Sequence, residues 1–164
     1  MRLTPAGLSA FGRLLPCTVG AGGIVPGDRK REGDGATPAG LWRISAALYR
    51  PDRMARPAPW AAPIRPGDLW CDEPSHPLYN RPARRPFEAS AERMDRPDPL
   101  YDLVLTTDWN AAGAPGRGSA IFLHRWRRPG YPTEGCIAMA PASLRWLAAR
   151  ARPGAPLLVP PLRM

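Results

Sequence analysis

The sequence contains almost no lysine and few cysteines. Lys30 is the single lysine among 23 basic residues. The three cysteines, Cys17, Cys71 and Cys136, share no CxxC spacing, which argues against a zinc site, and their odd number leaves at least one thiol free. Cys17 and Cys71 would pair only in an oxidising compartment, and the spacing does not decide between a disulfide and two thiols.

Long apolar runs are also missing. No stretch of eighteen apolar residues occurs, so we expect no transmembrane helix. Near the N-terminus, Gly12 and Arg13 interrupt the apolar segment that a secretory signal peptide would need. We therefore expect no export signal of that kind in this chain.

Acidic residues are scarce in the C-terminal third. Between positions 113 and 164, Glu134 stands alone against eight arginines, a net charge of +7, whereas positions 1–112 have 15 basic and 13 acidic residues, a net charge of +2. This asymmetry favours an anionic partner. An Arg-rich nucleic-acid-binding module is a remote alternative, because the aromatic residues do not alternate with the arginines as they do on a stacking platform. We expect no nucleic-acid partner.

The residues that are present suffice for one folded domain. A chain of 164 residues with 44% hydrophobic residues can bury a sizeable core. The 23 prolines and 16 glycines separate runs rich in branched and aromatic residues, which is typical of a β-rich domain with stiff loops. We therefore predict a single, mainly β domain over residues 1–164. Strands are expected within residues 12–20, 100–107, 119–126 and 155–161, whereas residues 41–49 are ambiguous because only their first half alternates as a strand would.

Two other segments stand out. Residues 141–152 repeat apolar side chains at helical spacing, with Leu144, Leu147, Ala148 and Ala151 on one face, and they predict a packed helix. Residues 51–99 contain eleven prolines and little periodicity. We interpret them as a proline-rich loop insertion that wraps the core and caps the functional site.

Only two histidines occur. His76 lies between prolines, which favours a turn or surface position. His124 falls on a predicted strand, twelve residues before Cys136, with a turn-forming segment between them. An imidazole beside a thiol can take its proton and generate a thiolate, so the pair is a candidate Cys–His dyad for attack on a carbonyl. A buried cysteine and a core histidine are the alternative.

The residues around Cys136 fit acyl transfer. Gly135 permits close approach of a substrate carbonyl to the backbone, and successive N–H groups at Glu134, Gly135 and Cys136 are candidates for an oxyanion hole. No aspartate is well placed to orient His124, because the nearest upstream acid is Asp108. A backbone carbonyl would have to serve.

Three separated motifs carry a family resemblance. "KREGDGATPAG" at residues 30–40, "SAIFLHRW" at 119–126 and "PTEGCIAM" at 132–139 occur in that order. Together they resemble the signature of the YkuD-like L,D-transpeptidases over about residues 14–159. The resemblance implies a single catalytic domain with a β-sandwich or barrel-like core, one or a few packed helices and long loops.

The resemblance also implies an activity and roles for residues. Cys136 would be the acyl-forming nucleophile, His124 its base, the Arg125 carbonyl the group that orients the imidazole, and Gly135 part of the oxyanion hole, with Thr133 holding the turn. The substrates would be peptidoglycan stem peptides, cross-linked to a diaminopimelate amine without metal or other cofactor. The family implies the periplasm, and we expect a monomer.

Two departures from the signature concern specificity. Ala138 stands where the family has an arginine, and Arg125 where it has a glycine. Donor cleavage at the third stem residue, giving 3–3 links, and at the first L-alanine, giving 1–3 links, both stay open, with Arg117, Arg127 or Arg128 as candidate replacement cations. An L,D-carboxypeptidase, in which water replaces the amine, is the alternative function.

Further residues are candidates for binding substrate. They are polar or aromatic and lie near the motifs or in loops that we expect to border a groove: Tyr79, Asn80, Trp109, Asn110, Trp126, Thr133 and Glu134. Residues 30–40 are interpreted chiefly as consecutive turns, with a border on the substrate groove as the alternative.

Overall fold

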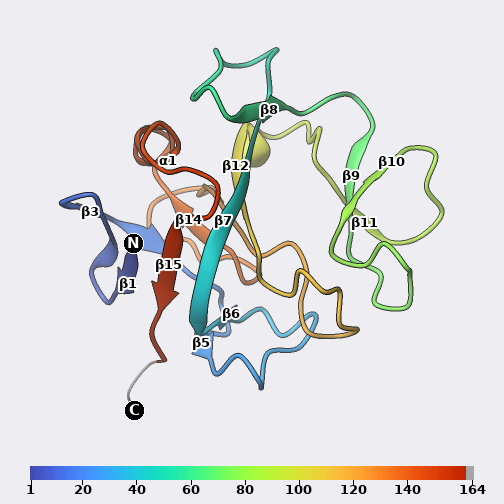
Figure 1. Ribbon diagram of the computed structural model, residues 1–164, viewed down its shortest axis with the longest axis horizontal. Helices are drawn as coiled ribbons and strands as arrows, with labels where there is room; N and C mark the ends of the chain where they lie inside the picture. Colours follow the sequence, from blue (N-terminus) through green and yellow to red (C-terminus); the bar gives the residue numbers. More distant parts are fainter. Residues whose placement is uncertain (162–164) are drawn as a thin grey trace.

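The computed structural model describes residues 1–161 and is mainly β, as the sequence predicts (Figure 1). Its largest sheet has ten strands. They are β1 (Arg2–Thr4), β2 (Gly7–Ala10), β3 (Arg13–Leu15), β4 (Cys17–Thr18), β7 (Gly40–Tyr49), β8 (Ala61–Pro63), β12 (Leu103–Thr107), β13 (Phe122–Arg125), β14 (Ile137–Met139) and β15 (Pro156–Val159).

Two small sheets and two helical segments complete the described part of the chain. One sheet joins β5 (Ile24–Val25) to β6 (Thr37–Pro38), and the other joins β9 (Asp68–Cys71), β10 (Pro82–Arg84) and β11 (Ala91–Arg93). The helical segments are a 3₁₀ turn, η1 (Pro99–Tyr101), and the helix α1 (Pro141–Ala148). No helix within residues 1–161 is both long and apolar enough to cross a membrane.

The large sheet curls until its two edges nearly meet. Its order runs β3-β2-β1-β15-β7-β12-β13-β14-β4, so the edge strands β3 and β4 lie at opposite ends of the order. In the sequence these two strands are separated only by Pro16. Our prediction of one strand over residues 12–20 was therefore incomplete, because proline has no N–H for a ladder and divides the segment there.

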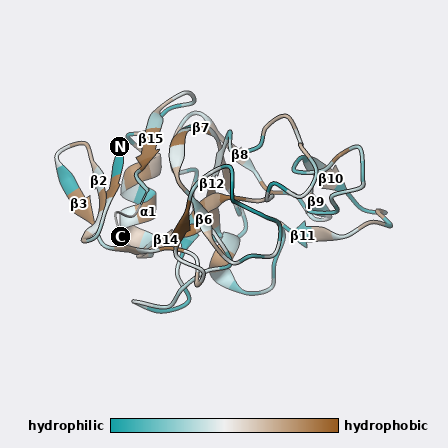
Figure 2. Ribbon diagram, turned by 90° about the horizontal axis from the view of Figure 1, so that it is seen from below, coloured by the Kyte–Doolittle hydropathy of each residue, from teal (hydrophilic) through white to brown (hydrophobic). Residues whose placement is uncertain are grey.

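The centre of this sheet positions the functional residues. β7 pairs antiparallel with β12, β12 antiparallel with β13, and β13 parallel with β14. All five residues of β12 are buried, because helix α1 contacts one side of this region and other segments cover the opposite side. Figure 2 shows β14 and its neighbours in the brown of hydrophobic residues.

Helix α1 begins at Pro141 and buries Leu144, Leu147 and Ala148, the face that the helical spacing predicts. Proline suits the first turn because its missing N–H would have no partner there. The helix ends at Ala148, so Ala151 lies beyond it, although Ala151 is still buried.

Residues 51–99 are more ordered than we predicted. They contain β8 and the whole three-stranded sheet β9–β11, which lies at the opposite end of the molecule from α1 in Figures 1 and 2. These strands gave no periodic signal because they have only three or four residues, and two of them carry proline at an end, Pro63 closing β8 and Pro82 opening the edge strand β10.

Two further strand predictions need correction. In residues 119–126 the strand covers only Phe122–Arg125, because Ala120 has φ +50 and lies in the left-handed region, where a strand cannot run. In residues 100–107 the strand begins at Leu103, after η1. The strands β1 and β2 were not predicted, since their three and four residues give little periodicity.

Candidate active site

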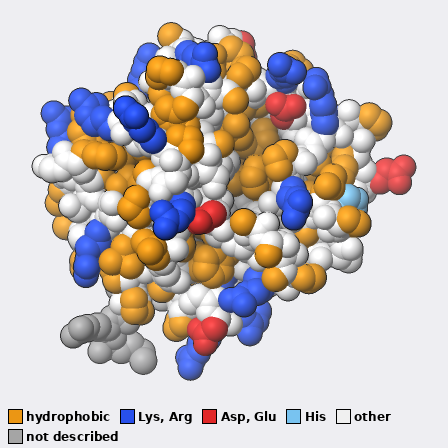
Figure 3. Space-filling view, in the orientation of Figure 1, with side chains coloured by type: hydrophobic (Ala, Val, Ile, Leu, Met, Phe, Trp, Pro, Cys, Tyr) orange, Lys and Arg blue, Asp and Glu red, His pale blue; other side chains and the backbone are white. Residues whose placement is uncertain are grey.

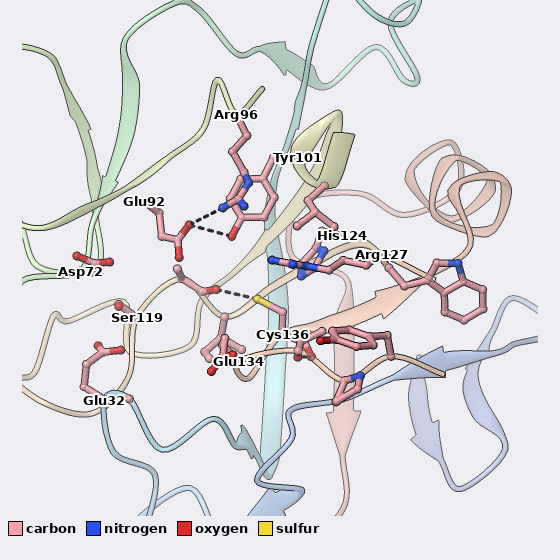
Figure 4. Close-up of a pocket in the computed structure, with 18 residues that line it drawn as sticks. Glu32, Asp72, Glu92, Arg96, Tyr101, Ser119, His124, Arg127, Glu134 and Cys136 are labelled. Atoms are coloured by element: carbon pink, nitrogen blue, oxygen red, sulfur yellow. Dashed lines mark hydrogen bonds and ion pairs between the residues drawn. The ribbon is translucent and has the colours of Figure 1, made fainter. Parts of the chain in front are cut away.

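A pocket of about 310 Å³ contains both members of the candidate dyad. His124 lies on β13, and Cys136 directly precedes β14. In the parallel pairing of these strands His124 is opposite Ala138, so the loop between the strands returns the cysteine to the side of the histidine. Figure 4 shows the imidazole and the sulfur in the same pocket, with His124 above Cys136.

His124 is held in one tautomer. Its Nδ1 lies 2.6 Å from the carbonyl oxygen of Arg125. A carbonyl only accepts hydrogen bonds, so Nδ1 carries the hydrogen and Nε2 keeps a free lone pair. Burial lowers the pKa of His124 to about 4, and the ring is therefore neutral near pH 7. Tyr101 packs against it edge to face at 5.5 Å between centroids.

Cys136 is a protonated, buried thiol in this structure. Its Sγ donates to the carbonyl oxygen of Ala120 at 3.1 Å and accepts from the N–H of Phe122 at 3.4 Å. Burial raises the pKa of the thiol to about 12. The resting pair is thus thiol and neutral imidazole, not thiolate and imidazolium, and a nucleophile has to be generated as the reaction proceeds.

The turn before Cys136 is fixed by Thr133 and Gly135. The Thr133 hydroxyl donates to the Cys136 carbonyl at 2.6 Å and accepts from the Gly135 N–H at 3.1 Å. Gly135 has φ +135, and a Cβ there would lie 2.9 Å from the Ala36 carbonyl oxygen, so no other residue fits without displacement. The Cys136 N–H makes no hydrogen bond within residues 1–161.

Residues 30–40 pack against this turn and hydrogen-bond to it. The Thr37 hydroxyl donates to the Gly135 carbonyl at 2.8 Å and accepts from the Gly20 N–H at 2.9 Å. Lys30 is buried and forms an ion pair with Asp34. Glu32 and Gly33 line the pocket, so the segment both makes turns and borders the candidate site.

The far wall of the pocket carries charge. Glu92 accepts from the Tyr101 hydroxyl at 3.4 Å and lies 3.4 Å from Arg96, which also pairs with Asp98 at 2.8 Å. Burial raises the pKa of Glu92. Asp72 lines the same wall and has one buried oxygen without a partner in residues 1–161. Asp72, Glu92 and Arg96 were not predicted as site residues, because they lie in the proline-rich residues 51–99, where no periodicity pointed to a site.

The structure brings together only some of the residues that we proposed for substrate binding. Trp126, Thr133 and Glu134 line the pocket. Tyr79 does not, and its hydroxyl donates to the Glu32 carboxylate. Asn110 lies outside the pocket as well, and its amide bonds the backbone of Ala114 and Gly118.

Asn80 is also outside the pocket, and its amide is used within the protein. It bonds the Trp70 ring N–H, the Ala120 N–H and the carbonyl oxygens of Trp109 and Asn110. His76 lies in a turn, where its Nδ1 accepts from the Leu78 N–H at 3.0 Å.

The cations and thiols outside the dyad are also placed. Arg127 lines the pocket, whereas Arg117 donates to the Gly27 carbonyl outside it and Arg128 stacks on Tyr131. Ala138 is fully buried between β13 and β4.

Cys17 and Cys71 are free thiols. No group of three or more His, Cys, Asp or Glu side chains within residues 1–161 is arranged to hold a metal ion.

A nearly closed β-sheet with a histidine on one strand and a cysteine before its parallel neighbour defines a mainly β domain built around a Cys–His pocket. A family model described as YkuD, the L,D-transpeptidase catalytic domain, matches residues 11–159, and the chain belongs to this family.

The other comparisons are distant. No curated protein sequence matches the chain. Among solved structures, an L,D-transpeptidase from Mycobacterium smegmatis is similar at 16% identity and a TM-score of 0.42, over 91% of this chain and 49% of its own. The chain thus spans about half the length of that structure.

Proposed function

We propose that this chain is a peptidoglycan L,D-transpeptidase that works through an acyl-enzyme at Cys136. The observation that carries the proposal is the shared pocket in which the Arg125 carbonyl holds His124 with Nε2 unprotonated beside a buried thiol. Membership of the L,D-transpeptidase family supports the same activity. Because peptidoglycan is assembled outside the inner membrane, we place the enzyme there.

The proposed reaction needs one proton carrier. The Cys136 sulfur attacks the carbonyl carbon of the amide that follows an L-residue of the donor stem, and its proton passes to Nε2 of His124 as the S–C bond forms. The proton moves on to the leaving amine as the C–N bond breaks. A diaminopimelate amine of a second stem then attacks the thioester and gives a proton to Nε2, and the released sulfur recovers it.

The oxyanion formed in both steps needs donors. We assign the Cys136 N–H as the first donor, since it has no acceptor within residues 1–161. The Gly135 N–H is the second, and it must leave the Thr133 hydroxyl as the carbonyl arrives. Each such donor contributes about 10²–10³ in rate in comparable acyl-transfer enzymes.

The donor is proposed to be cleaved after the first L-alanine, which gives 1–3 links. Ala138 is fully buried and supplies no cation where the family has an arginine. Arg127 lines the pocket instead, and since it forms no ion pair within residues 1–161 it is available to the free carboxylates of the stem. Mass spectrometry of digested peptidoglycan treated with the enzyme should show 1–3 cross-links, and 3–3 links alone would contradict this assignment.

The acyl-enzyme has a direct test. A carbapenem should add its mass to the wild-type chain and leave Cys136→Ala unmodified in intact-mass spectra. Cys17→Ala is the matched control and should react like the wild type, because Cys17 lies on β4 outside the pocket. Absence of an adduct on the wild type would count against the function, and stem peptides shortened without cross-links would identify a carboxypeptidase.

A further inference from the structure

The resting thiol is bound to a strained residue. The Cys136 sulfur donates to the Ala120 carbonyl at 3.1 Å, and Ala120 has φ +50. A side chain disfavours this left-handed backbone, so a non-glycine residue persists there only where its surroundings hold it. The position of the thiol's acceptor therefore depends on whatever fixes Ala120.

Asn80 supplies that restraint. Its Oδ1 accepts from the Ala120 N–H at 3.0 Å and from the Trp70 ring N–H at 3.0 Å. Its Nδ2 donates to the carbonyl oxygens of Trp109 at 2.8 Å and Asn110 at 3.0 Å. Both lone pairs and both hydrogens of the amide are used, which fixes its orientation.

The other side of Ala120 is held as well. The Thr107 hydroxyl on β12 donates to the Ile121 carbonyl at 2.7 Å, and Ile121 is buried. With its N–H held by Asn80 and the next carbonyl held by Thr107, Ala120 has little freedom to rotate. Its own carbonyl is left directed at the sulfur of Cys136.

We propose that Asn80 is a positioning residue for Cys136: it keeps Ala120 left-handed, so that the Ala120 carbonyl holds the thiol hydrogen until substrate enters. This role rests on the proposed function only for its effect on catalysis. A carbonyl that accepts from S–H stabilises the thiol over the thiolate. When the sulfur attacks, its proton goes to Nε2 of His124, and Ala120 loses only a hydrogen bond.

The test uses the reactivity of the thiol without substrate. Asn80 has φ +57, so Asn80→Gly removes the side chain without straining the backbone. Alkylation of Cys136 by iodoacetamide, followed at its own peptide by mass spectrometry across pH, should show a midpoint about one unit lower. That shift corresponds to roughly tenfold faster alkylation below the midpoint. Acylation by a carbapenem should become about tenfold slower, because the sulfur is no longer aimed.

The matched control is Asn110→Gly. Asn110 also has a left-handed backbone, φ +49, and an amide whose nitrogen and oxygen both bond the backbone, but that amide contacts Ala114 and Gly118 and not Ala120. Its alkylation midpoint and acylation rate should stay within twofold of wild type. An equal shift in this variant would show general loosening and overturn the inference.

A second change tests whether Asn80 acts through Ala120. Glycine accepts φ +50 without strain, so Ala120→Gly added to Asn80→Gly should restore part of the midpoint and of the acylation rate. An unchanged midpoint in folded Asn80→Gly, or no restoration in the double variant, would overturn the inference.

If Asn80→Gly does not fold, Asn80→Asp decides, because it keeps the oxygen that faces the Ala120 N–H. Its midpoint should not fall, and a fall would contradict the proposed role. Since alkylation needs no substrate, a carbapenem-inert chain that still shows the shift would refute the proposed function and leave this inference standing.

Discussion

The polar groups on the two walls of the pocket have different bonding partners. The dyad wall, formed by β13, β14 and the turn at Thr133, carries the Cys136 thiol and the neutral imidazole of His124, and the hydrogen bonds of both groups go to backbone atoms. The charged wall, contributed by residues 72–96, carries Asp72, Glu92 and Arg96. On the face of the molecule shown in Figure 3, basic side chains are spread among apolar ones and acidic ones are few.

We assign different tasks to the two walls: proton transfer to the dyad wall and substrate binding to the charged wall. On the dyad wall, burial keeps the thiol protonated and the imidazole neutral, so the lone pair of Nε2 is free to accept a proton. The far wall carries charges of both signs, Glu92 and Arg96, which we propose bind the charged groups of the substrate.

The largest effect is expected from His124→Gln on the dyad wall. Glutamine cannot accept the thiol proton and pass it on, so acylation by a carbapenem should slow by about 10²–10⁴. Intact-mass kinetics measure the rate. His76→Gln, at the other histidine, should stay close to wild type, and similar losses in both variants would exclude a specific base.

The pH dependence of stability comes next. Burial places the pKa of His124 at about 4, below its value in the unfolded chain. The folded protein therefore binds fewer protons than the unfolded protein between about pH 6.5 and 4. Stability contributed by the neutral ring is present above pH 6.5 and is lost as the pH falls through this window. Urea unfolding should show a loss of about 2–3 kcal/mol between pH 7 and 4.5. The loss should be much smaller in His124→Gln, and equal losses would contradict the assignment.

A smaller effect is expected from Thr133→Val, which leaves the Gly135 N–H and the Cys136 carbonyl without their hydroxyl partner. The free energy of unfolding should fall by about 1–3 kcal/mol, and acylation should slow by roughly tenfold. Thr18→Val is the control, since the Thr18 hydroxyl makes only a long bond of 3.5 Å to Ala138. A cost at Thr18 as large as that at Thr133 would argue against a special role for the turn.

The smallest effect belongs to the charged wall. Burial raises the pKa of Glu92, so the carboxylate destabilises the fold increasingly as the pH rises above its unfolded pKa. Glu92→Gln should therefore raise Tm at pH 7 by about 1–3 °C, because the side chain is only partly buried. No gain should remain near pH 4, and exposed Glu88→Gln should change Tm at neither pH. A lower Tm at pH 7 would show that the carboxylate is stabilising.

The residues of the dyad wall were predicted from the sequence much better than those of the charged wall. The signature motifs, the glycine at position 135 and the spacing of His124 and Cys136 are local patterns. Local patterns predict such a wall well because the same short segments form the turn and the strand ends in the structure. The helix was recognised for the same reason. The charged wall was not, since Asp72, Glu92 and Arg96 reach the pocket only through a sheet whose short strands leave no periodic signal.

From the chain alone, composition and strand-like runs predicted the class of fold, and the motifs that resemble the family signature predicted the candidate nucleophile and base. Only the tertiary structure decided that Asn80 bonds Ala120 instead of lining the pocket, and that the resting thiol is bound to the Ala120 carbonyl. Those contacts join residues 40 and 16 positions apart, and hydrogen bonds over such separations depend on how the loops pack, which no local pattern encodes.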